Sequence, residues 1–490
     1  MLGEVVMLED LVYRESNACY STSVLLVDHG VEARCEYAGI FERNGFTVVR
    51  WEDDLRFRID WEGALKAGER LCVIVGRDDY VPYDLRQLMQ VYEVSLGRMF
   101  PKLDVRTLRE DESLDLDFLA CAYERELVHT SGAKATREFI ERQVNVRTTA
   151  ERVCDGLESE LVRAATAAGG YRDWIAVAEL KARIDVTAAR YGLDRSTNVW
   201  TDGAFRDFVK AKYGQLTMAM DDETPVLVST AMEWMHSRSD RFAVIVMDGM
   251  SEFDWRVIRE SFGGVAYEQS AAFAMVPTVT SLSRQSLLAG KFPRYLDKPW
   301  TTGREKNEFF SCVTGWGVDK ERVAYLRGYD DELPWGCDYV AYVILDVDER
   351  VHGQYGGRAG MLKDMELLRD GGKLVDLVRR LLGAGMDVYI TADHGNTPCV
   401  GRGRVTGTGV ETETKGKRMY VANDLADVSA LQDKYELIEC PAAFLPLGLK
   451  YYVCPSGVSF DNPGEHVMSH GGMSIDEVVV PFISIRSESA

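Results

Sequence analysis

The stretch FAVIVMDGM, residues 242–250, decides the fold of the second half of the chain. Its apolar run, Phe242 to Met247, predicts a strand that is buried on both faces of a parallel sheet. Asp248 follows at the carboxyl end of this strand, which is the end where open parallel sheets bind their ligands. The stretch therefore predicts an α/β domain with an acidic group at the ligand-binding edge of its sheet.

Three later stretches repeat this pattern of a buried strand. They are YVAYVIL (339–345), MDVYIT (386–391) and VVVPFISI (478–485). The first runs into Asp346 and Asp348, and the second is followed by Asp393. Because the carboxyl ends of parallel strands meet at one edge, we expect these carboxylates to converge with Asp248. Residues 240–490 are therefore predicted to form one α/β domain, with helices on both faces of its sheet.

The first half of the chain divides into two further segments. Residues 1–103 alternate strand-like and helix-like stretches, which predicts a small α/β domain. A helix is expected around residues 38–44, and another over residues 83–99. Residues 104–239 carry charged residues among Leu, Ala and Val at helical spacing, which predicts a helical connecting or interaction domain.

Acidic residues also end the predicted strands of the N-terminal segment. Asp28 closes SVLLVD, and Asp78 and Asp79 follow LCVIVG. Acidic strand ends can bind cations or phosphate-bearing ligands. Ordinary loop chemistry is the simpler explanation of these residues, and we take it as the main interpretation.

Composition excludes several functional classes. The 490 residues include 57 Lys and Arg against 78 Asp and Glu, and the net charge of −21 argues against a general surface for long polyanions or anionic membranes. Ten cysteines occur without a C-x-x-C pair, so neither a zinc ribbon nor a dense disulfide framework is indicated. The start lacks the features of a secretory signal, and the apolar runs are far shorter than the about 20 residues of a spanning helix. We expect a cytoplasmic protein with no membrane segment.

Histidines cluster near the predicted acidic strand ends. Four of the seven histidines follow residue 350, at His352, His394, His466 and His470. Asp348 and His352 are four apart and would face one side of a helix, Asp393 and His394 are adjacent, and His470 precedes two glycines that permit close backbone approach. With Asp248 they form a mixed Asp and His set that suits zinc or manganese, and six ligands would serve two ions. A lone Asp-x-x-x-His pair is more often a surface ion pair, and His466 is an alternative to His470.

A run of hydroxyl residues supplies nucleophile candidates. The stretch PTVTSLSRQSLLAGKFP, residues 277–293, leads from Pro277 into a helix predicted to begin near Ser281. A hydroxyl there could simply cap the helix. A metal bound to it would instead lower its pKa and let it attack phosphorus. The candidates are Thr278, Thr280, Ser281 and Ser283.

Basic residues near these motifs are candidates for binding substrate. Arg284 could contact a phosphoryl oxygen, or it could be a solvated helix arginine. The Gly- and Thr-rich stretch 402–418 contains Lys415, Lys417 and Arg418 in an otherwise acidic chain. It could grip substrate phosphates, and a solvated loop is the alternative.

Five motifs in this order resemble the alkaline phosphatase superfamily, and their wording is most similar to its PglZ-domain branch. They are FAVIVMDGMSEFDW, PTVTSLSRQSLLAGKFP, ILDVDERVHG, YITADHGN and SHGGMSIDEVVVPF. The resemblance covers about residues 240–490 and implies an alkaline-phosphatase-like sheet. It implies one metal held by Asp248, Thr280, Asp393 and His394, and a second held by Asp348, His352 and His470. Thr280 is the implied nucleophile, because it lies three residues after Pro277, and zinc is the usual ion, with manganese possible.

The same resemblance implies a function. Thr280 would attack a phosphodiester in line, and water would then hydrolyse the phosphothreonine. We expect a two-metal phosphodiesterase acting on nucleotides or short oligonucleotides, in a setting of BREX-type phage defence, with partner proteins bound through the helical middle. The alternatives are a metal-binding scaffold for a defence complex and a phosphomonoesterase. PglZ domains are also fused to response-regulator receivers, but LLVDHG has one acidic residue where a receiver begins with an acidic pair.

Overall fold

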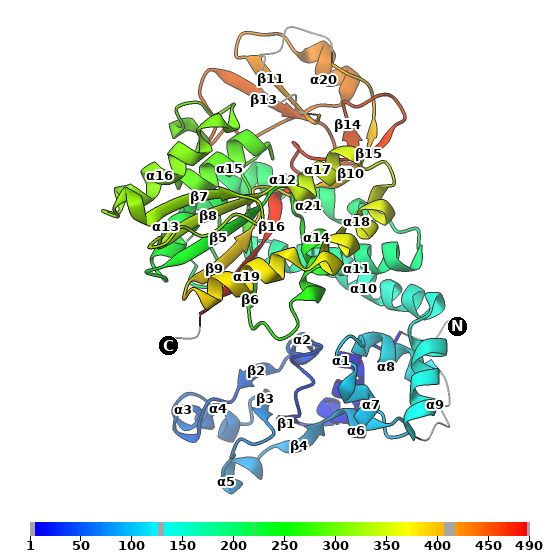
Figure 1. Cartoon of the computed structure of the whole chain (residues 1–490). Helices are drawn as coiled ribbons and strands as arrows, with labels where there is room; N and C mark the ends of the chain where they lie inside the picture. The colour runs from blue at the N-terminus through cyan, green and yellow to red at the C-terminus, as the bar shows by residue number, and fades with distance from the viewer. Residues whose placement is uncertain (1–4, 126–131, 220, 406–416, 488–490) are drawn as a thin grey trace. The chain divides into compact units, whose positions relative to one another are not determined.

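The structure, a computed structural model, describes residues 5–125, 132–219, 221–405 and 417–487 (Figure 1). The chain divides into two compact units, residues 1–159 and 160–490. This division differs from the three predicted segments, 1–103, 104–239 and 240–490. The reason is that some helices of the middle segment pack within the first unit and others pack against the sheet of the second unit. Helix α10 (Arg147–Ala167) runs through the division.

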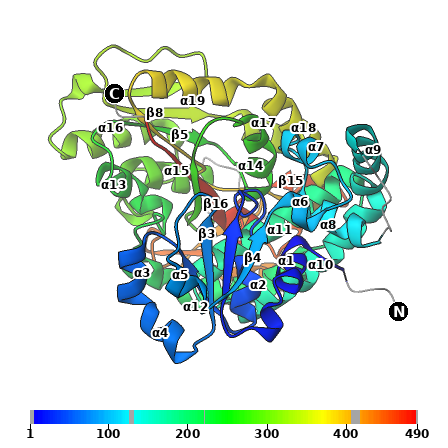
Figure 2. The same cartoon turned by 90° about the horizontal axis from the view of Figure 1, so that it is seen from below.

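The first unit contains a parallel sheet with strand order β2-β3-β1-β4. Its strands are β1 (Val24–Asp28), β2 (Thr47–Arg50), β3 (Leu71–Gly76) and β4 (Gln90–Val94). Figure 2 shows β3, β1 and β4 side by side. The helices of this unit are α1 (Leu8–Glu15), α2 (Ala38–Arg43), α3 (Asp54–Asp60), α4 (Glu62–Ala67), α5 (Tyr83–Arg86), α6 (Leu96–Met99), α7 (Val105–Glu110), α8 (Leu116–Arg125) and α9 (Gly132–Phe139). The expected α/β pattern and the helix near residues 38–44 are confirmed.

The predicted helix over residues 83–99 is wrong. The structure has the short helices α5 and α6 there, with strand β4 between them. The sequence of β4, QVYEV, buries Tyr92 and Val94 at alternate positions, which is the period of a strand. Strand β4 also pairs in parallel with β1, and this pairing decides between the two structures.

The second unit is built on a sheet with strand order β6-β16-β9-β5-β8-β7. Its strands are β5 (Phe242–Met247), β6 (Glu268–Phe273), β7 (Val323–Arg327), β8 (Tyr339–Ile344), β9 (Asp387–Thr391) and β16 (Val479–Ile485). Strands β5, β7, β8 and β9 pair in parallel, whereas β16 runs antiparallel to both of its neighbours. Because β9, β5 and β8 are adjacent and parallel, their carboxyl ends lie together at one edge of the sheet.

Helices cover both faces of this sheet, which confirms the predicted α/β class. In Figure 1, α13, α15 and α16 lie on one side, and α14, α18 and α19 lie on the other. The helices of this unit are α11 (Tyr171–Tyr191), α12 (Asn198–Lys212), α13 (Ala231–His236), α14 (Glu252–Ile258), α15 (Thr280–Ala289), α16 (Glu305–Gly315), α17 (Asp346–Gly353), α18 (Gly357–Gly371), α19 (Lys373–Gly383), α20 (Ser429–Tyr435) and α21 (Ile475–Val478).

Two small sheets complete the second unit, with strand orders β14-β10-β15 and β11-β13-β12. Their strands are β10 (Thr397–Gly401), β11 (Met419–Asn423), β12 (Ile438–Glu439), β13 (Leu449–Val453), β14 (Val458–Ser459) and β15 (His466–Ser469). Strand β10 follows β9 after a short loop, and β15 ends just before His470. The loop that follows β9 and the loop that follows β15 carry predicted metal ligands.

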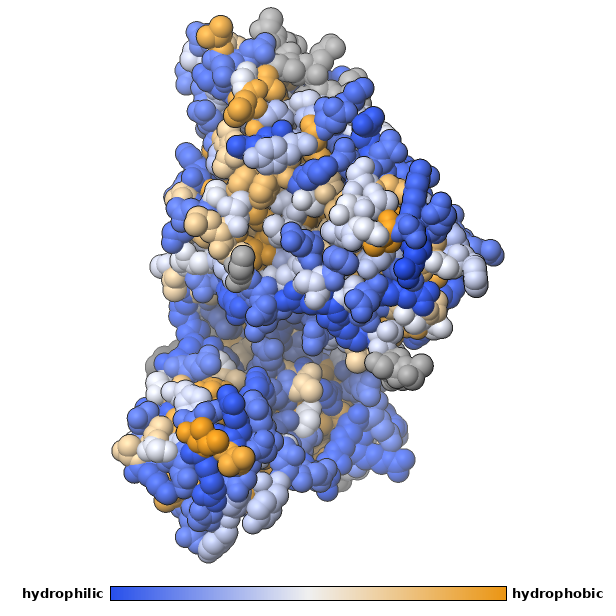
Figure 3. Space-filling model, turned by 90° about the vertical axis from the view of Figure 1, so that its left-hand side faces the viewer, coloured by the Kyte–Doolittle hydropathy of each residue, from blue (hydrophilic) through white to orange (hydrophobic). Residues whose placement is uncertain are grey.

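Apolar side chains are mainly inside the protein. The strands β5 and β8 are buried along their whole length. The face drawn in Figure 3 is largely hydrophilic, and the apolar side chains on it gather in a few patches. No helix in the described parts of the chain combines the length and apolar character that crossing a membrane requires.

Candidate metal centre

Three neighbouring strands bring the predicted carboxylates together. Asp248 directly follows β5, Asp393 comes two residues after β9, and Asp348 lies in the first turn of α17 after β8. The turn after Asp248 needs glycine, because Gly249 has φ +75° and a Cβ there would lie 3.3 Å from the Cβ of Asp348. The sheet topology therefore builds the acidic edge that the sequence predicted.

Local hydrogen bonds hold the loop after β5. Ser251 begins α14 with a capping box, in which the backbone N–H and hydroxyl of Ser251 both donate to Asp254 Oδ2, at 2.8 and 2.7 Å. Asn396 Nδ2 donates to the carbonyl of Gly249 (2.9 Å) and to Asp254 Oδ2 (2.6 Å). The loop of Asp248 is thus fixed to the loop that carries Asp393 and His394.

The first group of candidate ligands surrounds His394. Its Nε2 lies 3.6 Å from Asp248 Oδ1, 3.7 Å from Asp393 Oδ2 and 2.9 Å from Thr280 Oγ1. Asp393 and His394 are fully buried, and Asp248 is nearly so. Asp393 is positioned by backbone N–H groups of Gly249 and His394, which donate to its Oδ1. These residues are those that the resemblance assigned to one metal.

The second group surrounds Asp348. His470 Nε2 lies 3.4 Å from Asp348 Oδ1, and His352 Nε2 lies 3.1 Å from Asp348 Oδ2. The ring of His470 stacks on that of His394, with centroids 4.1 Å apart and an angle of 12°. His352 is the outer member, because 45% of its side chain is exposed, whereas His470 is 14% exposed.

The donor atoms in these groups fit divalent cations. Asp248 Oδ1, Asp348 Oδ1 and Asp393 Oδ2 are buried and have no hydrogen-bond partner. Ligand atoms about 2.1 Å from a tetrahedral ion are about 3.4 Å apart, which is close to the separations of 3.4 to 3.7 Å found here. Asp248, Asp393 and His394 form one group with ligand atoms within 4.8 Å of each other, and Asp348, His394 and His470 form another.

Electrostatics of the cluster favour a bound cation. Burial raises the pKa of Asp248 to about 8, with a further rise from the charge of Asp393, and burial raises the pKa of Asp393 to about 6. Burial would also raise the pKa of Asp348, but the hydrogen bond from His352 and the charge of His470 hold it below its usual range. Burial lowers the pKa of His470 to about 4. The clustered carboxylates therefore repel one another in the metal-free protein, and a divalent cation would relieve this repulsion.

The candidate hydroxyls have different surroundings. Thr280 begins α15 without capping it, and its Oγ1 is the one near His394. Thr278 donates to the carbonyl of Gly472 at 3.0 Å. Ser283 donates to the carbonyl of Asp393, and the buried Ser281 Oγ has no hydrogen-bond partner. Thr280 is therefore the hydroxyl that faces the candidate ligands.

Arg284 is buried and contacts one of the candidate metal ligands. Its buried guanidinium pairs with Asp248 Oδ2 through Nη1 and with Glu305 Oε2 at 2.8 Å through Nε. Nη1 also lies 4.0 Å from Asp393 Oδ2. The solvated-arginine alternative does not match this burial. The side chain balances the charge of the carboxylates, and this gives it a role besides the predicted substrate contact.

The predicted substrate-binding lysines of the stretch 402–418 differ in what the structure shows of them. Lys415 lies outside the described residues. Lys417 pairs with Asp461 at 3.4 Å and is close enough for its charge to lower the pKa of His352, although the hydrogen bond to Asp348 leaves that pKa raised. Lys417 is therefore near the mouth of the cluster.

Arg418 was predicted to contact substrate, but its side chain lies inside the protein. Its guanidinium is fully buried, pairs with Glu477, and donates to the carbonyls of Val458 and Pro455, both at 3.0 Å. These bonds use Nε and both terminal nitrogens inside the protein. The sequence placed Arg418 in a solvent-facing basic stretch and gave no sign of its buried partner.

The sequence reasoning also missed Glu477. Its carboxylate accepts hydrogen bonds from the backbone N–H of Gly472 (2.8 Å) and from Thr278 Oγ1 (3.3 Å), in addition to the pair with Arg418. The carbonyl of Thr278 lies 3.1 Å from His470 Nδ1. Glu477 thus fixes the loop that carries His470. The only sequence signal is its place in the motif SHGGMSIDE.

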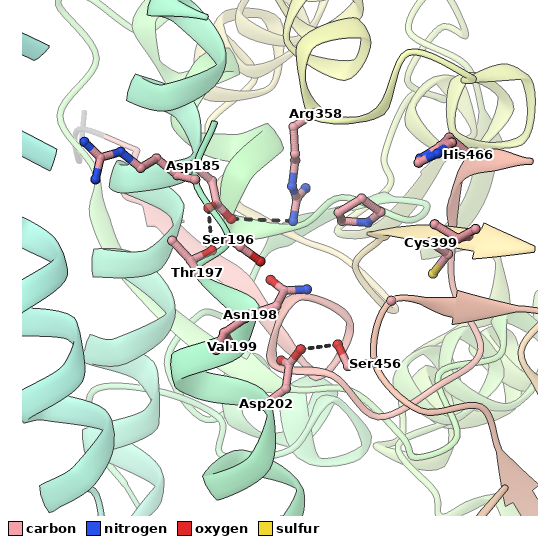
Figure 4. Close-up of a pocket in the computed structure, with 14 residues that line it drawn as sticks. Asp185, Ser196, Thr197, Asn198, Val199, Asp202, Arg358, Cys399, Ser456 and His466 are labelled. Atoms are coloured by element: carbon pink, nitrogen blue, oxygen red, sulfur yellow. Dashed lines mark hydrogen bonds and ion pairs between the residues drawn. The ribbon is translucent and has the colours of Figure 1, made fainter. Parts of the chain in front are cut away.

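A separate pocket of about 470 Å³ lies in the same unit (Figure 4). His466, which the sequence offered as an alternative to His470, lines this pocket. It is therefore not part of either group of candidate metal ligands. Asp185, Asp202 and Arg358 also face this pocket, where Thr197 Oγ1 donates to Asp185 Oδ1 at 2.6 Å. None of the candidate metal ligands lines it.

Comparison with known proteins supports the family named from the motifs. Residues 337–485 match the family model described as the BREX system PglZ alkaline phosphatase-like domain. A search of curated proteins found no match. Similar solved structures include murine ectonucleotide pyrophosphatase/phosphodiesterase 5 (11% identity, TM-score 0.36, covering 50% of this chain and 89% of that one). Phosphonoacetate hydrolase from Sinorhizobium meliloti 1021 gave 14% identity and a TM-score of 0.32, covering 50% and 90%.

Proposed function

Since residues 337–485 match the model of the BREX system PglZ alkaline phosphatase-like domain, we propose that the second unit is a two-metal phosphodiesterase with Thr280 as its nucleophile. The observation that carries this proposal is the position of Thr280 Oγ1, 2.9 Å from His394 Nε2 and beside carboxylate oxygens that have no hydrogen-bond partner. The proposed substrates are nucleotides or short oligonucleotides.

Two sets of residues would hold the ions. Asp248, Thr280, Asp393 and His394 would bind one, and Asp348, His352 and His470 would bind the other. When bound, zinc or manganese would lower the pKa of the Thr280 hydroxyl and neutralise charge on the phosphoryl oxygens.

The chain's own residues then account for the remaining chemistry. The hydroxyl of Thr280 loses its proton to solvent and its Oγ1 forms a bond to phosphorus. The bond from phosphorus to the leaving oxygen breaks, and that oxygen takes up a proton from solvent as an alcohol, which leaves a phosphothreonine. Water then hydrolyses this ester and restores the hydroxyl. Arg284 favours the ionised form of Asp248 through their ion pair, against the burial that raises its pKa. Lys417, near His352, offers a positive charge to the part of the substrate at the mouth of the cluster.

The test is hydrolysis of bis(p-nitrophenyl) phosphate by the purified chain with zinc or manganese, beside p-nitrophenyl phosphate. We expect Thr280→Ala to lower kcat by at least about 1,000-fold, because it removes the attacking atom, and the measurement is made at a metal concentration that saturates the variant, since Thr280 is also a proposed ligand. Ser281→Ala is the matched control, since the neighbouring hydroxyl has no hydrogen-bond partner. Turnover in Thr280→Ala within tenfold of wild type would rule out this nucleophile. Preference for the monoester would indicate a phosphomonoesterase, and no turnover with both metals bound would indicate a scaffold.

We also propose a biological setting. The description of the matched domain as part of the BREX system supports a role in antiphage defence in the cytoplasm, with partner proteins bound through the helices of residues 104–239. A plaque assay tests this setting in a host that carries the complete defence system. Thr280→Ala is expected to restore plaque formation, and undiminished protection in that variant would separate defence from catalysis.

A further inference from the structure

The first unit contains a pocket at the carboxyl ends of neighbouring parallel strands. Its volume is about 540 Å³, within the usual range of small-molecule sites. It is lined by His29, Gly30, Val31, Ala33 and Arg34 after β1, by Leu96 after β4, and by Arg109 and Glu112 in and after α7. Strands β1 and β4 pair in parallel and lie side by side in Figure 2. This is the position at which open parallel sheets bind ligands.

The loop that forms one wall of the pocket is fixed by Asp28. Its carboxylate accepts hydrogen bonds from the backbone N–H groups of Gly30 (2.8 Å) and Val31 (3.2 Å) and from the hydroxyl of Tyr37 (3.0 Å). These bonds occupy both carboxylate oxygens. The acidic strand end therefore shapes the loop and is not available as a cation ligand.

The pocket wall carries the positive charge of Arg34, a half-buried side chain. Arg34 donates through its terminal nitrogens to the carbonyls of Leu108 (3.0 Å), Asp111 (2.8 Å) and Leu114 (3.2 Å). Its Nε is buried without a hydrogen-bond partner. Burial lowers the pKa of Arg34, so the charged form is held at a cost. The charges of Asp111 and Glu112 act on Arg34 and raise its pKa, but within the described residues neither forms an ion pair with it, and an anion at Nε would stabilise it further.

Two more donors face the same space. His29 Nε2 is buried without a hydrogen-bond partner, and the closest approach recorded for a carboxylate, Glu93 Oε2, is 3.9 Å. Arg109 is exposed on α7, and no hydrogen bond or ion pair engages it in the parts of the chain that the structure describes. Glu112 is the acceptor among these pocket residues. The pocket thus combines several cationic or N–H donors with one carboxylate.

We propose that this pocket binds a small phosphate monoester that carries hydroxyl groups, a class that includes nucleoside monophosphates and sugar phosphates. Arg34, Arg109 and His29 bind the phosphate, since arginine and imidazole N–H groups form strong charge-assisted hydrogen bonds with it. Glu112 accepts hydrogen bonds from the hydroxyls, as acidic residues do in many parallel-sheet nucleotide sites. This site is distinct from the metal centre, and its ligand need not be a substrate.

Calorimetric titration of the full chain in the presence of a chelator tests this proposal without the catalytic metals. The probes are AMP, ribose 5-phosphate, adenosine and inorganic phosphate. We expect AMP or ribose 5-phosphate to bind more tightly than phosphate, and adenosine not to bind. The tighter of the two identifies the source, a nucleotide or a sugar phosphate.

Variants locate the binding. Arg109→Gln is expected to weaken binding of the phosphorylated probe at least tenfold, and Glu112→Gln to weaken it without affecting phosphate. Arg106→Gln is the matched control on the same helix, where Arg106 pairs with Glu110 at 2.7 Å, and it should bind like wild type. Since Arg109 is exposed, its replacement should leave the melting temperature unchanged. Absence of saturable binding by wild type, or binding that is equal in Arg109→Gln and Arg106→Gln, would overturn the proposal.

Discussion

The ion pair between Arg284 and Asp248 gives a prediction about the coupling of stability to metal. Arg284 is 4% exposed and pairs with Asp248 and Glu305, which are 5% and 2% exposed. Arg284→Met keeps the apolar stem and removes the charge, so both carboxylates lose a buried cation. Glu305 keeps a second partner in Arg327, whereas Asp248 is left beside Asp393. The main effect is therefore expected at the candidate metal site.

The magnitude follows from the burial of the pair. Removing one partner of a buried ion pair costs about 3 to 5 kcal/mol when the group left behind stays ionised, so the melting temperatures are measured at about pH 9, above the pKa of about 8 to which burial raises Asp248. At about 2 °C per kcal/mol for a unit of this size, the melting temperature in chelator should fall by about 6 to 10 °C. A bound cation would neutralise the buried carboxylate of Asp248 that has lost its partner, so zinc should raise the melting temperature more in the variant than in wild type.

The assay is differential scanning fluorimetry of wild type and variant, each with chelator and with zinc. Lys291→Met is the matched control, because Lys291 also pairs with a glutamate of α16, Glu308, at 3.3 Å but is 45% exposed. A pair of this kind contributes about 0 to 1 kcal/mol. A fall of less than 2 °C for Arg284→Met in chelator would refute the argument from burial. An equal effect of zinc on both proteins would refute the coupling to metal.

Two further predictions concern the same loops. In the metal-free protein, Asp248 has a pKa of about 8 when folded and about 4 when unfolded, so the stability from its protonation is present below about pH 4 and is lost as the pH rises through 8. The melting temperature in chelator should therefore fall from about pH 4 to about pH 8, and a fall as steep in Asp248→Asn would contradict this assignment. Gly395→Ala should lower both stability and zinc binding, because its Cβ would lie 2.0 Å from the carbonyl oxygen of Asp476. A melting temperature and a zinc affinity equal to those of wild type in this variant would show that the backbone moves to accommodate the added Cβ at no cost.

The sequence predicted the elements whose structure depends on local pattern. The apolar runs at β5, β8 and β9 identified buried strands, and the residues after them identified the carboxylates at the sheet edge. Strand β4 was missed because its five residues are too few to separate a strand from a helix by period alone. Its pairing with β1 is a contact between segments more than 60 residues apart, and a local pattern carries no sign of it.

The sequence was less informative about cationic side chains. Arg284 and Arg418 were predicted to contact a substrate phosphate. The sequence shows that each carries a positive charge, but it does not show which carboxylate pairs with it. Their partners Asp248 and Glu477 lie 36 and 59 residues away along the chain. Buried ion pairs of this kind exist only after folding brings the two charges together in a low-dielectric interior.

The sequence by itself determined the class of the fold, the motifs that match the PglZ family model over residues 337–485 and the residue types of the candidate metal centre. These properties follow from apolar periodicity and from motifs a few residues long, so they can be read without the partners of each residue. Only the tertiary structure decided which hydroxyl faces His394 and which basic residues form buried ion pairs. It also decided that a pocket lies at the carboxyl ends of β1 and β4 in the first unit. The physical reason is that these properties are distances between atoms remote in the sequence, and folding alone sets them.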